Sequence, residues 1–408
     1  KVIEPMISIS RFQGGYCDQE LINYFWKIIF KNQFHDSIYG SSPDSINHTV
    51  ENRLLNLRHG LNELIWMNFR YLAESVDLSV LKENEDILVL FNTLPYQRND
   101  YAFTSMIVKD KNFVLKRQDG TIVPYEIMNE VKATSHDIEY YNGMENFHDA
   151  GEVLEGTKFK VQIKIAASFL PPMGYEVLKV CFHERTSKRP EGDVVILKNG
   201  AENKYLVMHI QEDGTLSVTN KQTQETYHQL NTFVEKGDDG DEYNYSPPYQ
   251  DKLVDTRQLK PVIECVEDNE MEIAYQFSYI LETPKECINH YRSQETVKSS
   301  FDVIISLKKQ SRQIDVKTVV NNHAKDHRIR AMIKDIHKHH YNQSQDHFGY
   351  TIRHNQILNQ VGLENGATEE VLPLYTMQKF VRLVDSPLAL ITKGACEYEI
   401  IDDCQIAL

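Results

Sequence analysis

The sequence has little cysteine, and its cysteines are not paired. The six cysteines lie at positions 17, 181, 265, 287, 396 and 404, and no Cys-x-x-Cys motif occurs. A structural zinc site built from four cysteines is therefore not expected, because such sites use closely spaced pairs. The scattered positions favour a reducing compartment over a disulfide-stapled secreted scaffold. We therefore predict a cytoplasmic protein.

The chain also lacks long apolar runs and an excess of basic residues. No run of about 18 apolar residues is present, so no transmembrane helix is expected. The 408 residues include 44 basic and 59 acidic side chains, which gives a net charge of −15. This charge argues against nucleic acid or an anionic membrane surface as the main partner. Neither a Gly-x-Ser-x-Gly nucleophile elbow nor a P-loop appears in the sequence.

Helical spacing dominates the first eighty residues. Residues 18–31 and 43–76 carry apolar side chains three and four positions apart, and the longer segment would span roughly 50 Å as a helix. Ser42 before Pro43 and Asp44 is typical of a helix start with Ser42 as the cap. Trp26 and Trp66 are expected to pack in the core of this region. Two such helices joined by a short corner predict an antiparallel pair.

From Ile87 onward the pattern changes to alternation with a period of two. Alternating segments include 159–165, 271–281, 301–307 and 314–320, and Asp-Gly pairs at 119–120 and 213–214 mark turns. Many strands without helices between them indicate antiparallel sheets packed as sandwiches. The predicted fold class is therefore α+β and multidomain. An antiparallel helical bundle (residues 1–82) precedes mostly antiparallel β-sandwich domains (residues 83–408).

A His-Asp pair stands at the corner between the two helical segments. His35 could bind a divalent metal, and Asp36 could hold a hydroxyl group or the same metal. Taken alone, such a pair at a helix end is more often a cap with a solvated partner. The longer string Asn-Gln-Phe-His-Asp-Ser-Ile-x-Gly-Ser-Ser, which begins at Asn32, resembles the helix-end motif of glycoside hydrolase family 38, the retaining zinc-dependent α-mannosidases.

Further segments resemble the same family in the same order along the chain. They lie at residues 87–96, 322–330, 377–381 and 393–399. The resemblance implies a middle helical domain followed by β-sandwich structure, without the N-terminal catalytic domain. It also implies further β-structure after Leu408, so we expect this chain to be a piece of a larger enzyme.

The resemblance implies which residues take part in function. It assigns His35 as one ligand of a zinc ion and Asp36 as a contact to a substrate hydroxyl. The nucleophile and the acid/base would lie outside this chain, so no catalytic residue is assigned in it. The zinc site is then incomplete, and we expect the chain alone to have no mannosidase activity.

An acidic loop at residues 238–248 forms a second candidate site. Its acids, tyrosines and prolines suit recognition of sugar hydroxyls, although an acidic surface turn is the commoner reading of such a string. The resemblance places this loop at the active site and favours Tyr243, then Asp241, as substrate contacts. Its acidity looks closer to the bacterial members, which include mannosylglycerate hydrolases.

Other polar clusters are expected to have ordinary structural roles. The histidine-rich stretch at residues 337–340, with His347, is predicted to be a solvated loop, and His327 and Arg328 are expected to pair locally at the end of a strand. The functional prediction is part of an α-mannosidase that cleaves terminal α-mannosyl linkages. The alternatives are a mannosylglycerate hydrolase of the same family or a non-catalytic carbohydrate-binding β-sandwich. Expected partners are an oligosaccharide or mannoside and the chain's own N-terminal catalytic domain, and the resemblance implies a homodimer.

Overall fold

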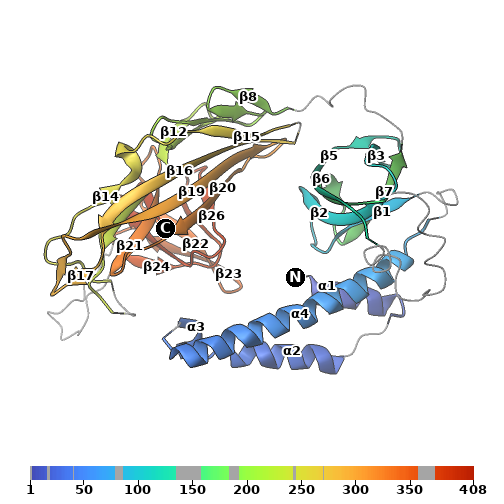
Figure 1. The fold of residues 1–408 in the computed structure, drawn as a ribbon, viewed down its shortest axis with the longest axis horizontal. Coiled ribbons are helices and arrows are strands. Elements are labelled where there is room, and N and C mark those ends of the chain that lie inside the picture. Colours follow the sequence, from blue (N-terminus) through green and yellow to red (C-terminus); the bar gives the residue numbers. More distant parts are fainter. Residues whose placement is uncertain are drawn as a thin grey trace. The chain divides into compact units, whose positions relative to one another are not determined.

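The structure is a computed structural model of an α+β multidomain chain (Figure 1). It describes residues 2–15, 19–39, 41–78, 86–134, 158–182, 193–241, 245–269, 271–356 and 373–408. The chain divides into two compact units, residues 1–190 and 191–408. No helix in these described ranges has both the length and the apolar character needed to cross a membrane.

The first unit begins with helices, as the 3.6-residue spacing predicts. Buried Ile7, Ile22, Phe25, Leu57 and Leu64 form their shared core. Gly60 lets the helices approach closely, because a Cβ atom there would lie 2.6 Å from the Phe25 ring. The helices are α1 (Ile3–Phe12), α2 (Gln19–Lys31), α3 (His35–Tyr39) and α4 (Asp44–Glu74).

Two expectations for this helical region are wrong. Pro43, and not Ser42, is the residue that caps α4, since its ψ of 150° is extended, and no side chain caps the helix end. Trp26 and Trp66 are 40% and 45% exposed, so neither is a core residue. The Trp26 indole instead donates a hydrogen bond to Glu4 at 3.1 Å.

Two antiparallel sheets enclose a second core in the first unit. One has the order β1-β7-β3-β4 and the other β2-β6-β5. The core includes Leu115 and Leu178 from the first sheet and Val161, Ile163 and Ile165 from the second. The strands are β1 (Ile87–Asn92), β2 (Arg98–Val108), β3 (Phe113–Lys116), β4 (Ile122–Val123), β5 (Tyr125–Lys132), β6 (Phe159–Leu170) and β7 (Gly174–Phe182).

Tyr125 makes this core sensitive to high pH. Its hydroxyl donates to the Phe113 carbonyl oxygen at 2.6 Å, and its ring stacks on that of Phe113 at 4.6 Å. Burial raises the pKa of Tyr125 to about 12. The folded-state pKa therefore exceeds the unfolded value of about 10, so the stabilisation is complete below pH 10 and is lost as the pH rises toward 12.

We expect the free energy of unfolding to fall with rising pH in this window, and to fall less steeply in Tyr125→Phe, which cannot ionise. Urea unfolding at a series of alkaline pH values measures the slope. Tyr96→Phe, the same change at an exposed tyrosine, serves as the control. An unchanged slope in Tyr125→Phe would contradict the prediction.

The second unit is built from antiparallel strands, as the alternating pattern predicts. Its main core fills the space beneath the long hairpin of β16 and β19 and includes Phe277, Phe301, Val303 and Ile305. The sheets have the orders β12-β11-β10-β9-β8, β14-β13-β21-β28-β27-β24, β15-β16-β19-β20, β17-β18 and β23-β22-β25-β26. The sheet that contains β13 and β21 is called the β13–β21 sheet below.

The strands of the second unit have the following bounds: β8 (Val195–Leu197), β9 (Gly200–Glu202), β10 (Leu206–Ile210), β11 (Leu216–Asn220), β12 (Thr226–Leu230), β13 (Thr232–Gly237), β14 (Val254–Asp255), β15 (Glu264–Asp268), β16 (Glu272–Pro284), β17 (Cys287–Ile288), β18 (Tyr291–Arg292), β19 (Thr296–Lys308), β20 (Ile314–Asn321), β21 (His327–Lys334), β22 (Tyr341–Asp346), β23 (Gly349–His354), β24 (Leu374–Thr376), β25 (Phe380–Leu383), β26 (Ala389–Ile391), β27 (Glu397–Ile401) and β28 (Gln405–Ala407). The short 3₁₀ helix η1 (Thr256–Gln258) follows β14.

Candidate functional site

The His-Asp corner is a short helical turn of its own. After α2 ends at Lys31, the amides of Asn32 and Gln33 still bond back to α2 carbonyl oxygens, and α3 then begins at His35. The ring of Phe34 lies 4.5 Å from the His35 imidazole. The sequence therefore places His35 in the first turn of α3, where its backbone conformation is fixed and its side chain projects outward.

Both side chains of the corner are accessible. His35 and Asp36 are 68% and 47% exposed, and His35 Nε2 lies 3.2 Å from Asp36 Oδ1. An exposed imidazole beside a carboxylate can bind a metal or orient a hydroxyl group. Within the described ranges, however, no group of three or more His, Cys, Asp or Glu side chains is arranged to hold a metal ion. The corner thus fits part of a zinc donor set and does not complete one.

The base of the corner carries a buried amide. Asn32 is only 6% exposed, and neither its Oδ1 nor its Nδ2 atom has a hydrogen-bond partner among the described residues. Buried amides are normally paired, so an unpaired one indicates an interaction that the described part of the chain does not supply.

The acidic loop is held at its base by its own carboxylates. Asp238 accepts hydrogen bonds from the amides of Gly240 and Ser246 at 3.0 and 3.1 Å. Asp239 pairs with His290 at 2.5 Å, which ties the loop to the β17–β18 hairpin. Asp241 is exposed. Tyr243 lies outside the described residues.

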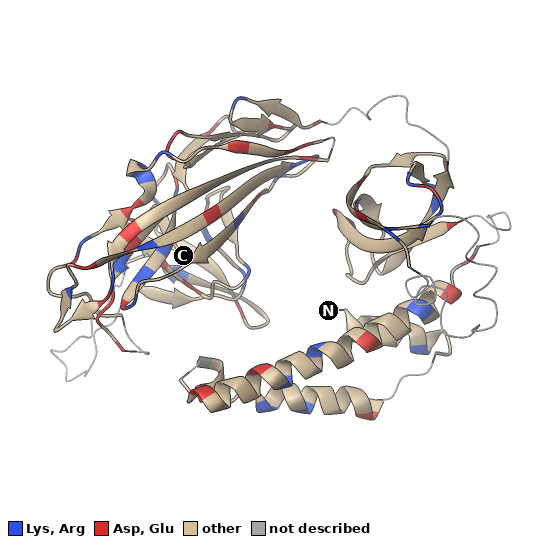
Figure 2. Ribbon diagram, in the orientation of Figure 1, with Lys and Arg blue, Asp and Glu red and all other residues tan. Residues whose placement is uncertain are grey.

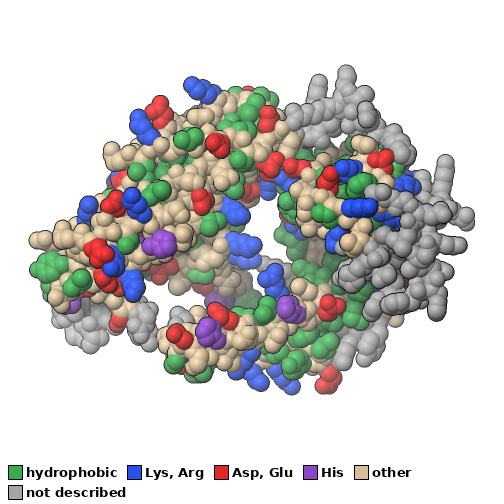
Figure 3. Space-filling model, viewed as in Figure 1, with side chains coloured by type: hydrophobic (Ala, Val, Ile, Leu, Met, Phe, Trp, Pro, Cys, Tyr) green, Lys and Arg blue, Asp and Glu red, His purple; other side chains and the backbone are tan. Residues whose placement is uncertain are grey.

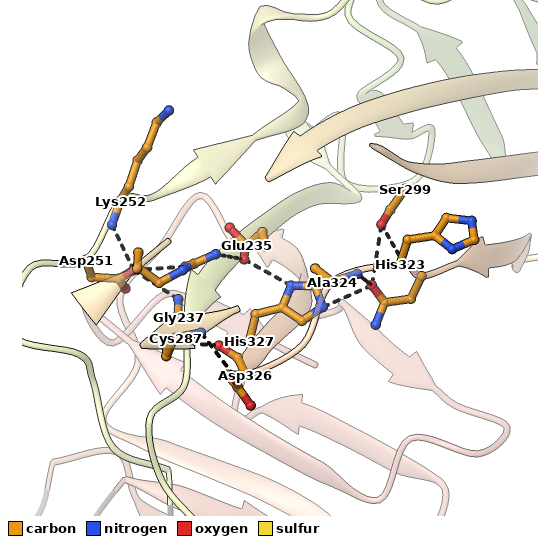
Figure 4. A network of polar contacts seen from close by, with 12 residues as sticks. Glu235, Gly237, Asp251, Lys252, Cys287, Ser299, His323, Ala324, Asp326 and His327 are labelled. Atoms are coloured by element: carbon orange, nitrogen blue, oxygen red, sulfur yellow. Dashed lines mark hydrogen bonds and ion pairs between the residues drawn. The ribbon is translucent and has the colours of Figure 1, made fainter. Parts of the chain in front are cut away.

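A network of charged side chains with a buried centre at Glu235 and Arg292 includes residues on both sides of this loop in the sequence (Figure 4). Glu235 on β13 has no solvent exposure and contacts Arg292 Nη2 at 2.5 Å and His327 Nδ1 at 3.0 Å. Arg292 also contacts Asp251 Oδ1 at 3.1 Å, and the other nitrogen of His327 contacts Asn322 at 3.0 Å. The network therefore joins β13, the β17–β18 hairpin and the turn before β21.

The same network reaches the backbone of the acidic loop. Asp251 Oδ1 accepts a hydrogen bond from the Gly237 amide at 2.9 Å, one residue before the loop begins. A Cβ atom on Gly237 would lie 2.5 Å from Arg292 Cδ and 2.7 Å from Pro248, so only glycine fits there. Arg292 and Asp251 therefore fix where the loop leaves β13.

An arginine on β21 stacks on a tyrosine of the acidic loop. The Arg328 guanidinium lies 3.4 Å from the centroid of the Tyr245 ring, which is a cation–π contact. Burial lowers the pKa of Arg328, and neighbouring Arg330 lowers it further. Burial also raises the pKa of Tyr245, which Arg328 partly offsets. The pair presents a cation and a hydroxyl group next to the acidic residues, a combination suited to sugar hydroxyls.

The candidate residues fall into two separate groups. His35 and Asp36 belong to the first unit and Asp241 belongs to the second. The expectation for His327 is wrong: it begins β21, and its partner Glu235 is 92 positions away in the sequence. The expectation of a local partner for Arg328 is also wrong, since Arg328 stacks on Tyr245 and lies 4.0 Å from Glu399. Sequence reasoning missed Glu235 and Arg292. The alternation in His-Arg-Ile-Arg, which puts Arg328 and Arg330 on one strand face, was an available signal.

The histidine-rich stretch is only partly solvated. His337 and His347 are exposed and pair with Glu225 and Asp346. The side chain of His339 is 10% exposed and lies 3.5 Å from Asp335, so it packs against the protein instead of facing solvent.

Comparison with known proteins adds family information. A family model described as "Glycosyl hydrolases family 38 C-terminal domain" matches residues 201–408, about half of the chain. A protein of Halalkalibacterium halodurans named "Putative mannosylglycerate hydrolase" is 22% identical over 440 residues, which cover 98% of this chain and 47% of that protein.

Solved structures give the same picture for the fold. An alpha-mannosidase from Enterococcus faecalis V583 matches with a TM-score of 0.84 and 21% identity, covering 100% of this chain and 48% of that one. A protein described as belonging to glycosyl hydrolase family 38, also from Enterococcus faecalis, matches with a TM-score of 0.82 and 21% identity, covering 100% and 50%. The chain therefore spans about half the length of these proteins.

Proposed function

Because the chain belongs to glycosyl hydrolase family 38, we propose that it is the helical and C-terminal β-structural part of a retaining α-mannosidase that uses zinc. The observation that carries this proposal is the exposed His35–Asp36 pair, held in the first turn of α3 within a motif of that family. A module that only binds carbohydrate has no need of a metal-competent imidazole at a helix corner. The whole enzyme would cleave terminal α-mannosyl linkages of oligosaccharides or glycosides.

His35 would supply one ligand to the zinc ion. When bound, zinc would hold adjacent hydroxyl groups of the sugar and favour distortion of its ring. The role of Asp36 would be to accept a hydrogen bond from one of those hydroxyls, since its carboxylate stays accessible beside the imidazole. The remaining zinc ligands, the nucleophile and the acid/base would come from a preceding catalytic domain, which is then the first partner of this chain. The unpaired amide of buried Asn32 supports a further contact at this corner.

The acidic loop would contribute the remaining substrate contacts. Asp241 is exposed in a loop whose base is fixed by Asp238, Asp239 and the buried network. Tyr243 would lie on the same loop. Pre-organisation of such a loop limits the entropy lost when a sugar binds.

A mannosylglycerate hydrolase is the second candidate function. It is favoured by the match to a protein of that name over 98% of this chain. A non-catalytic sugar-binding protein is the remaining alternative. We also propose a cytoplasmic location, supported by the free thiols of Cys265, Cys287, Cys396 and Cys404 among the described residues. A homodimer is proposed on the family resemblance alone.

The proposal is tested with the protein that carries both this chain and its preceding domain. We expect it to hydrolyse an aryl α-mannoside, to release α-mannose first in a time-resolved proton NMR spectrum, and to lose activity when zinc is chelated. The 408-residue chain alone should be inactive. Parallel assays with mannosylglycerate separate the two hydrolase readings. Release of β-mannose first, or sugar binding without any hydrolysis, would refute a retaining mannosidase.

A further inference from the structure

Basic side chains line a pocket on the face of the β13–β21 sheet that points away from the main core of the second unit. The pocket has a volume of about 250 Å³, and its lining includes Lys236, Arg257, Arg330 and Lys334. Gln229 and Gln405 add side-chain amides, and no aspartate or glutamate is among the described residues that line it. This is unusual for a chain with a net charge of −15, whose acidic and basic residues are otherwise interspersed along the strands of the second unit (Figure 2).

Strand register explains why these cations share one face. Val234 on β13 pairs with Arg330 on β21, and Lys236 and Lys334 are two and four positions further along their strands. Lys334 pairs in turn with Gln405 on β28. Since residues two apart point to the same face of a sheet, all of these side chains lie on one surface. The floor beneath them is apolar and is formed by Val234, Met332 and Ala407.

Two of the cations are held in place by carboxylates outside the pocket. Asp255 binds the Arg257 guanidinium at 2.5 and 3.1 Å, and Glu399 pairs with Arg330. The Arg257 hydrogen bond lowers the pKa of Asp255, so this carboxylate stays ionised and keeps the guanidinium fixed. Both arginines therefore present their remaining donors to the pocket without having to be ordered by a ligand.

The two lysines have no such partner. Neither Lys236 nor Lys334 forms an ion pair within the described ranges, although Lys236 is partly buried. The four cations minus the charges of Asp255 and Glu399 leave two positive charges uncompensated. Held over an apolar floor, these charges attract anions more strongly than isolated surface lysines do.

We propose that this pocket binds an oxyanion, namely the phosphate or carboxylate group of a small ligand. Two uncompensated positive charges match one phosphate dianion, and guanidinium and ammonium groups form short charge-assisted hydrogen bonds with its oxygens. The amides of Gln229 and Gln405 can donate to the remaining oxygen atoms. The site does not depend on the proposed hydrolase activity, since binding can be measured without turnover.

The test is calorimetric titration with inorganic phosphate, glucose 6-phosphate and gluconate. The 408-residue chain and the longer protein with the proposed preceding domain are both titrated. We expect binding to weaken at least about tenfold in Lys236→Gln/Lys334→Gln, the change expected when charge-assisted hydrogen bonds are lost. The matched control is Lys298→Gln/Lys317→Gln, which removes the same charge from two exposed lysines on β19 and β20 and should bind like the parent. The three titrants distinguish a free phosphate ion, a sugar phosphate and a carboxylate as the ligand group.

Three results would overturn the proposal. The first is the absence of binding by any of the three anions. The second is equal weakening in the pocket variant and the control, which would indicate general attraction to positive charge. The third is binding by the 408-residue chain that disappears in the longer protein, which would indicate that the preceding domain covers the pocket.

Discussion

Replacing Arg292 with methionine is expected to destabilise the second unit by about 3–5 kcal/mol, the range measured when one partner of a buried ion pair is removed. The Arg292 side chain is 4% exposed and its partner Glu235 is fully buried. Removing the guanidinium leaves the Glu235 carboxylate with only His327 beside it, in a site that water does not reach. Asp251 also loses its contact to Arg292. Because Asp251 accepts a hydrogen bond from the Gly237 amide at the base of the acidic loop, we expect this base to be held less firmly.

Urea unfolding measures this loss, and hydrogen exchange at the Gly237 and Ser246 amides reports on the loop. In Arg292→Met/Glu235→Gln the stranded negative charge is also removed, so this double variant should be more stable than Arg292→Met alone. Lys285→Met is the matched control, since it breaks an exposed pair with Glu295 close to the same hairpin. Its free energy of unfolding should equal that of the wild-type protein, because exposed ion pairs contribute little to stability. If the free energy of unfolding of Arg292→Met also equalled that of the wild-type protein, the buried network would not stabilise the unit.

The spacing of apolar residues in the sequence predicts most of the long helices and strands of this chain, but it does not predict which tryptophans are buried. The three- and four-residue spacing of α4 and the alternation in β6, β16 and β19 are strong enough to predict those elements directly. Helix α1 contains Pro5, which it tolerates because the proline lies in the first turn of the helix. Trp26 and Trp66 were expected in the core because tryptophan is usually buried, but each packs its ring on a surface of the helices and remains 40% or more exposed.

The buried network could not be predicted from the sequence for a different reason. Its members come from β13, β18, the loop at Asp251 and the start of β21, and the closest contacts join residues 57 and 92 positions apart. Only the fold brings these charges together, and no local periodicity reports on such pairs. A glutamate inside the apolar run Thr-Phe-Val-Glu is a weak signal of a buried partner, because an unpaired charge there would cost several kcal/mol.

The distribution of charge on the surface does not by itself identify the candidate site. On the face shown in Figure 3, basic and acidic side chains alternate without a large patch of one sign. The His35–Asp36 pair was found through its motif, and its exposure in the structure agrees with a role in binding. The anion pocket, by contrast, required the register of β13 and β21, since Lys236 and Lys334 are almost one hundred positions apart.

Replacing His35 with alanine is the second change with a large expected effect. In the protein that includes the preceding domain, we expect the loss of bound zinc and a fall in kcat/KM of at least about 100-fold. Even partners of metal ligands cost about 10–100-fold when they are removed, so loss of a ligand should cost more. Because the side chain is 68% exposed, the change should leave the free energy of unfolding within about 0.5 kcal/mol. Metal analysis, steady-state kinetics and urea unfolding measure the three quantities.

His48→Ala is the matched control. His48 is 75% exposed on α4 and pairs with Glu51 at 3.4 Å, so it is also an exposed histidine beside a carboxylate in the helical region. It should keep both zinc and activity. Retention of zinc and of kcat/KM in His35→Ala would contradict the role of the corner, and equal zinc loss in both variants would indicate non-specific metal binding by histidines.

Asp36→Asn separates the two roles proposed at the corner. The amide keeps the shape of the carboxylate and can still accept one hydrogen bond, but it loses the charge that strengthens a bond from a sugar hydroxyl. If Asp36 contacts the substrate while His35 holds the metal, Asp36→Asn should retain zinc and still lose kcat/KM. Loss of zinc in both variants would instead make Asp36 a metal ligand, which its distance of 3.2 Å from His35 Nε2 also permits. The metal content of these two variants therefore distinguishes a hydroxyl contact from a second ligand at the same helix turn.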